Sequence, residues 1–166
     1  MTRPEPPLQG DERTMLVGWL DFHRETLAVK CDGLSSDQLS LRAIPPSTLS
    51  LAGLLRHMVE VERTYFRRTF AGRDVAAIPF EEDPFREDRY ADYSSAPDND
   101  GDVALANWRS EIQHARGIID AVKSLDDEGS SGLPMRFWLV KTLNEYARHN
   151  GHADLLRECI DGTVGE

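Results

Sequence analysis

Apolar residues recur at intervals of three and four along most of this chain of 166 residues, which is the spacing of helices that bury one face. The pattern predicts long helices over residues 12–32, 48–71, 103–124 and 134–160. We find no stretch with the strict alternation of a half-buried strand. Long amphipathic helices without a sheet bury their apolar faces against one another, so the sequence predicts an all-α fold, a four-helix bundle.

Residues typical of helix ends support these boundaries. They are Asp11, Ser47 or Ser50, Asp102, Pro134 and Gly162. Residues 73–100 lose the periodicity and form a long crossover loop between the second and third helices. Such loops are often functional. This one either covers a site or simply buries its aromatic rings. We interpret residues 1–166 as one domain, with residues 1–10 as a loose arm.

The formal net charge of −10 argues against a general binder of nucleic acid or of anionic membranes, because both partners are negative. No run approaches the roughly 20 apolar residues needed to cross a bilayer, and the N-terminus lacks the apolar core of a signal peptide. We therefore expect a cytoplasmic protein whose partner is a small molecule. Cys31 and Cys159 lie far apart, and we expect each to be a buried thiol, with a disulfide between them as the alternative.

The stretch 145–152 (EYARHNGH) is the part of the sequence that packing explains least. On a helix, Glu145, His149 and His152 occupy positions i, i+4 and i+7, so a carboxylate and two imidazoles share one stripe. These groups are donors that a divalent transition metal accepts. A stable site usually takes another ligand from elsewhere in the chain, and His57 on the second predicted helix is the leading candidate.

Two ligand pairs remain open on the fourth helix: Glu145 with His149, or His149 with His152, each completed by His57. Three protein ligands leave a position for water or a substrate thiol, as in catalytic zinc sites. The competing interpretation is ordinary packing, because a single histidine in a helix usually makes a hydrogen bond in the core or at the surface. We interpret the two other histidines in that way: His23 and His114.

Two segments resemble the DUF664 branch of the DinB superfamily: residues 49–66 (LSLAGLLRHMVEVERTYF) and residues 145–158 (EYARHNGHADLLRE). The resemblance covers nearly the whole chain in order and spacing. It implies a bundle of up-down-down-up topology, often homodimeric. Many such proteins bind a divalent metal through one histidine on the second helix and an H/E-x-x-x-H pair on the fourth. Carried onto this sequence, those positions are His57, Glu145 and His149.

The resemblance also implies roles for neighbouring groups. His152 would be a fourth ligand or a partner that orients one. Glu145 stands where many relatives have histidine, which keeps a ligand but adds negative charge. Zinc is the first expectation for the ion, with nickel, iron and manganese as alternatives.

The superfamily includes mycothiol-dependent maleylpyruvate isomerase and bacillithiol-linked transferases. The resemblance therefore implies a metal that activates water or a low-molecular-weight thiol, such as mycothiol, for transfer or isomerisation. Two other classes of function remain open. One is a metal-binding or stress-linked bundle without catalysis, and the other is a scaffold that has lost its metal.

Overall fold

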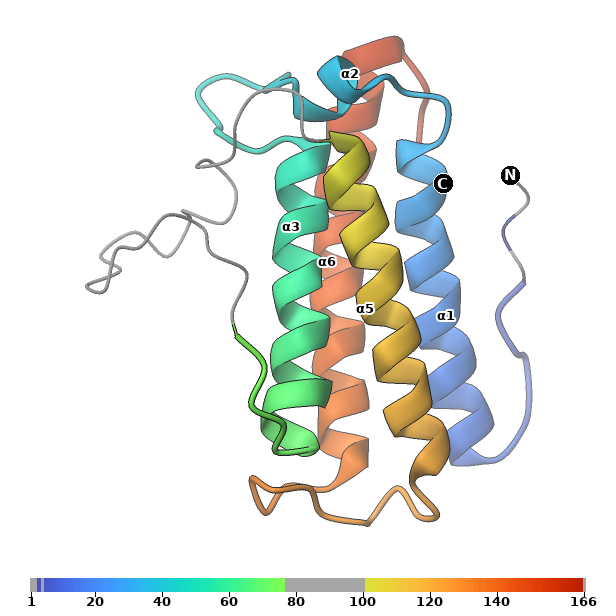
Figure 1. Ribbon diagram of the computed structural model, residues 1–166. Coiled ribbons are helices and arrows are strands. Elements are labelled where there is room, and N and C mark those ends of the chain that lie inside the picture. Colours follow the sequence, from blue (N-terminus) through green and yellow to red (C-terminus); the bar gives the residue numbers. More distant parts are fainter. Residues whose placement is uncertain (1–2, 4, 77–100, 166) are drawn as a thin grey trace.

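The computed structural model describes residue 3 and residues 5–76 and 101–165, which form a bundle of long helices (Figure 1). The helices are α1 (Glu12–Cys31), the short α2 (Ser36–Ser40), α3 (Leu51–Glu62), its continuation η1 (Arg63–Phe70), α5 (Gly101–Ala121) and α6 (Met135–Asp161). The described residues contain no β-strand beyond one isolated bridge. The predicted all-α bundle is therefore confirmed.

The long helices follow the up-down-down-up order that the resemblance implied, since Figure 1 shows α1 and α6 running one way and α3 and α5 the other. α1 packs mainly on α6, and α3 packs mainly on α5 while also contacting α6. The parallel helices α3 and α5 require a crossover along the bundle. Most of that crossover, residues 77–100, lies outside the described residues. The two alternatives given for this loop, a cover over a site or a connection that buries its aromatic rings, therefore lie outside them as well.

Three of the predicted helix ends are confirmed. The side chain of Asp11 caps α1 by accepting a hydrogen bond from the Thr14 amide, and Ser50, not Ser47, caps α3 in the same way. Gly162 ends α6 with φ 81°, a left-handed conformation that glycine adopts without strain.

Other details of the prediction are wrong. Asp102 lies inside the first turn of α5, which begins at Gly101, so it does not precede the helix. Pro134 takes the cap position with extended backbone, and α6 begins one residue later. Cys31 is buried as expected, but Cys159 is exposed because it lies on the solvent side of the last turns of α6.

The second predicted helix also differs, because its residues 63–70 form the π-helix η1 and not an α-helix. The Ala71 amide donates to the Phe66 carbonyl five residues earlier, where an α-helix would bond four residues back. Each turn of η1 thus holds more residues than a turn of α3. Side chains after Glu62 consequently point in directions that the α-helical spacing of the sequence does not predict.

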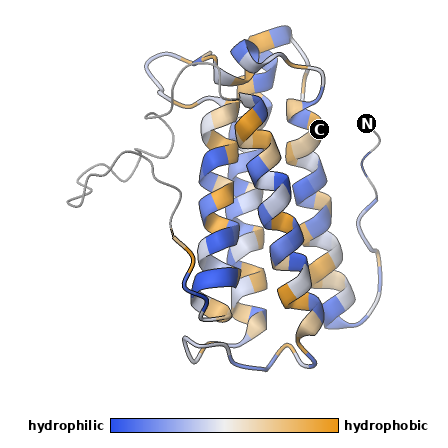
Figure 2. Ribbon diagram, in the orientation of Figure 1, coloured by the Kyte–Doolittle hydropathy of each residue, from blue (hydrophilic) through white to orange (hydrophobic). Residues whose placement is uncertain are grey.

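Each long helix carries mixed hydrophilic and hydrophobic residues (Figure 2), and the apolar ones form the core between the helices. This core also contains a polar network. Arg24 on α1 donates to both carboxylate oxygens of Glu62 on α3, each at 2.8 Å. The Tyr146 hydroxyl on α6 donates to Glu62 at 2.8 Å, and Trp108 on α5 donates to Tyr146 at 2.9 Å. Every long helix contributes one member, so the network fixes their relative positions.

The charges in this network compensate one another. Burial by itself lowers the pKa of Arg24, but the adjacent Glu62 carboxylate outweighs it and the net shift is upward. Burial and the Glu62 charge likewise raise the pKa of Tyr146, so its hydroxyl remains a donor.

Among the described helices, none has the length and apolarity needed to cross a membrane.

Replacing Glu62 by glutamine should destabilise the fold by up to about 3–5 kcal/mol, because it removes the buried carboxylate that pairs with Arg24 and leaves only the partly exposed Asp21 carboxylate beside that charge. Urea denaturation measures this change. Glu12→Gln is the matched control, since Glu12 pairs with Arg136 at the surface, where such pairs stabilise little, and its midpoint should stay close to that of the unchanged protein. Equal midpoints for the two variants would refute the role given to the network.

Candidate metal centre

Three side chains that the sequence singled out meet between α3 and α6. His57 comes from α3, and Glu145 and His149 come from successive turns of α6. One ligand atom from each lies within 4.8 Å of the other two. The Glu145 Oε2 atom is 3.7 Å from His57 Nε2 and 3.5 Å from His149 Nε2, and the two imidazole rings lie 4.6 Å apart at their centroids.

The two distances from Glu145 Oε2 are compatible with ligands of one small ion. Two ligands of a tetrahedral ion with bonds of about 2.1 Å lie roughly 3.4 Å apart, whereas neighbouring ligands of an octahedral ion with such bonds lie about 3.0 Å apart. The observed 3.7 and 3.5 Å are closer to the tetrahedral value, and both exceed a normal hydrogen bond. Two imidazole nitrogens and a carboxylate oxygen also form a ligand set typical of zinc.

His149 is held in the neutral form that a metal ligand requires. Its side chain is nearly buried, and burial, with the neighbouring His57 and His152, lowers its pKa to about 4 despite the opposing charge of Glu145. The side chains of His57 and Glu145 each keep about 20% of their surface exposed. The cluster is therefore most deeply buried at His149, and even the His57 Nε2 atom is out of contact with solvent although its ring is partly exposed.

His152 lies beside the cluster and not in it. Its Nδ1 atom is 3.2 Å from Nδ1 of His149, the ring nitrogen opposite the one that faces Glu145. This is the position of a partner that orients a ligand, one of the two roles the resemblance left open. It stays a prediction that a metal binds here, with its ligands among His57, Glu145, His149 and His152.

The remaining histidines have the ordinary environments expected of them. His23 is close to the Asn150 side chain, which donates to the His23 carbonyl at 3.0 Å. His114 is exposed on α5. Neither belongs to the cluster of possible ligands found among the described residues.

Tyr65 is a residue of the site that sequence reasoning missed. The sequence shows it only as one more aromatic residue of the second helix, whereas its hydroxyl donates to Glu145 Oε1 at 3.1 Å. Burial and the charge of Glu145 raise the pKa of Tyr65. Nothing in the sequence distinguishes this tyrosine from a core aromatic, since its direction depends on the π-helical turn.

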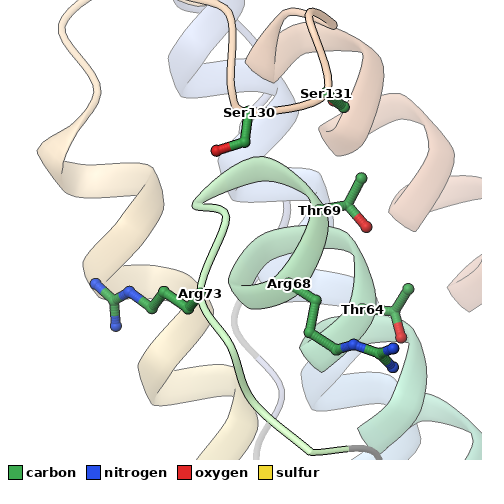
Figure 3. A pocket seen from close by; sticks show the side chains of 6 residues that line it. All are labelled: Thr64, Arg68, Thr69, Arg73, Ser130 and Ser131. Carbon is green, nitrogen blue, oxygen red and sulfur yellow. The ribbon is translucent and has the colours of Figure 1, made fainter.

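A separate polar hollow of about 480 Å³ lies where η1 meets the loop before α6. Its lining comprises Thr64, Arg68, Thr69, Arg73, Ser130 and Ser131. Figure 3 shows that the side chains of Arg68 and Arg73 extend in different directions, so they do not converge on one point. The hollow contains none of the three candidate ligands.

The lowered pKa of His149 predicts how the metal-free protein responds to acid. Below about pH 6.5 the unfolded chain binds a proton at this histidine, whereas the folded protein does so only near pH 4. Stability should therefore be lost as the pH falls through this window, by up to about 3 kcal/mol from this group. Chemical denaturation of protein stripped with a chelator measures the slope.

His149→Gln should flatten the slope between pH 6.5 and 4, and His114→Gln, a change at an exposed histidine, should leave it unchanged. An unaltered slope in His149→Gln would show that another group causes the acid sensitivity.

Comparison with protein families places the chain in a known family. The family described as mycothiol-S-transferase matches residues 15–162, a range that includes all three candidate ligands and Tyr65. No curated protein matches the chain. The family match confirms the resemblance to the DinB superfamily. Because the match covers most of its length, the chain belongs to the mycothiol-S-transferase family.

Proposed function

We propose that this protein is a metal-dependent thiol transferase that uses mycothiol or a closely related low-molecular-weight thiol. The observation that carries the proposal is the convergence of His57, Glu145 and His149 from two helices at ligand-like separations. The family match supports the choice of thiol. We propose zinc as the ion, because the separations approach those of a tetrahedral site.

The charge of the site suits thiol chemistry. Imidazoles that ligate a metal are neutral, so with the carboxylate of Glu145 the three ligands would carry one negative charge, fewer than a divalent ion needs for neutrality. A divalent ion held there supplies positive charge that lowers the pKa of a thiol and favours the thiolate. Glu145 moderates this positive charge, while His152 fixes the ring of His149 through its far nitrogen.

We place substrate entry on the side of the cluster where His57 and Glu145 each keep about 20% of their side-chain surface exposed. The His57 Nε2 atom itself is buried, so a substrate would have to approach from the side of Glu145. In the net reaction the thiol loses its proton and its sulfur bonds to an electrophilic carbon. The leaving group, or the oxygen of an opened epoxide, takes the electron pair of the broken bond.

We further propose that the protein is a homodimer, as the resemblance implies, and that it acts in the cytoplasm. Low-molecular-weight thiols remain reduced in that compartment, which is where a thiol-dependent transferase needs them.

Protein purified without a histidine tag and loaded with zinc should conjugate mycothiol to a chlorinated or epoxide electrophile. His57→Ala removes one of three ligands, so it should lose bound zinc and at least about 100-fold in turnover. His114→Ala, on the exposed side of α5, should keep both. Elemental analysis gives the zinc content, and product formation gives the turnover.

The outcomes separate the rival classes of function. Bound zinc without turnover of several thiols and electrophiles would indicate a metal-binding protein and refute the transferase. Failure of the unchanged protein to bind any divalent metal would indicate a scaffold. Unchanged zinc content in His57→Ala would refute the ligand set.

A further inference from the structure

The two oxygens of the Glu145 carboxylate have different neighbours. Oε2 faces the imidazoles, at 3.7 Å from His57 Nε2 and 3.5 Å from His149 Nε2. Oε1 accepts the hydrogen bond from the Tyr65 hydroxyl at 3.1 Å. An ionised carboxylate has no proton to donate, so the tyrosine is the donor in this contact. One oxygen is thus bound to Tyr65 while the other faces the histidines.

The ring of Tyr65 is itself held in place by α6. It packs against Trp138 with the ring centroids 5.4 Å apart, and the Lys141 Nζ atom lies 4.5 Å from its centroid. Trp138, Lys141 and Glu145 follow one another at i, i+3 and i+7, so they line one face of α6. Tyr65 lies across this face with its hydroxyl at the Glu145 end.

The π-helix explains how Tyr65 reaches this position. In a continuous α-helix, a residue eight positions after His57 would point about 80° away from it. The wider turns of η1 advance the chain by fewer degrees per residue, which brings Tyr65 back toward the side of His57. The irregular turn therefore aims two side chains of one helix, His57 and Tyr65, at the same carboxylate.

We propose that Tyr65 is a positioning residue that holds Glu145 with a single oxygen directed at the metal. This inference rests on the proposed metal site and deepens it. Without the hydroxyl, the carboxylate is free to rotate, either offering both oxygens to the ion or turning toward the open side of the cluster. Fixing it in advance lowers the cost of ordering the ligand when the ion binds.

The test is a double-mutant cycle on zinc affinity, measured by competition with a chromophoric chelator. Tyr65→Phe keeps the ring between Trp138 and Lys141 and removes only the hydroxyl. It should weaken zinc binding about 10–100-fold. Glu145→Ala should also weaken binding. Adding Tyr65→Phe to Glu145→Ala should then change the affinity less than about twofold, because the hydroxyl no longer has a ligand to hold.

Two results would overturn the inference: equal zinc affinity of Tyr65→Phe and the unchanged protein, or the same loss from Tyr65→Phe whether or not Glu145 is present. The second would mean a general structural effect, which denaturation of the metal-free variant would also register as a lower midpoint. If the unchanged protein binds no zinc, the proposed function fails and this inference fails with it. Zinc binding that is merely insensitive to Tyr65 would refute the inference alone.

Discussion

The buried pairing of Arg24 with Glu62 is the interaction on which the geometry of the molecule depends. It draws in Tyr146 and Trp108, so that one polar network joins all four long helices within the core. Buried charges tolerate little displacement, since a lost partner leaves a charge out of water. On α3, Glu62 lies farther along the helix that carries His57, and on α6 Tyr146 is the residue after Glu145. The hydrogen bond between Tyr146 and Glu62 therefore also sets how the candidate ligands on the two helices face one another.

The candidate metal centre combines a rigid side with an adjustable one. His149 is buried, neutral and held by His152, whereas Glu145 has partial exposure and depends on Tyr65 for its orientation. π-Helical turns are often found at functional sites, and here η1 lies directly after the part of α3 that carries His57. Family membership suggests a mycothiol-related transferase, and the cluster of His57, Glu145 and His149 is the place that we propose for its chemistry.

The sequence predicted the bundle and brought His57, Glu145 and His149 to notice, because apolar periodicity and i, i+4 spacing are local properties that a helix converts directly into geometry. It missed the buried pair, since Arg24 and Glu62 are residue types normally found at the surface. It missed Tyr65 because the π-helix changes the direction of side chains without changing the apolar pattern. The place of His152 depends on ring orientation, which spacing alone does not determine.

An anomalous difference map from crystals of the zinc-loaded protein tests the central claim most directly. The account predicts one peak between α3 and α6, about 2.0–2.2 Å from a nitrogen of His57, a nitrogen of His149 and a single oxygen of Glu145. A peak at any other group of side chains, or none between these two helices, would contradict it.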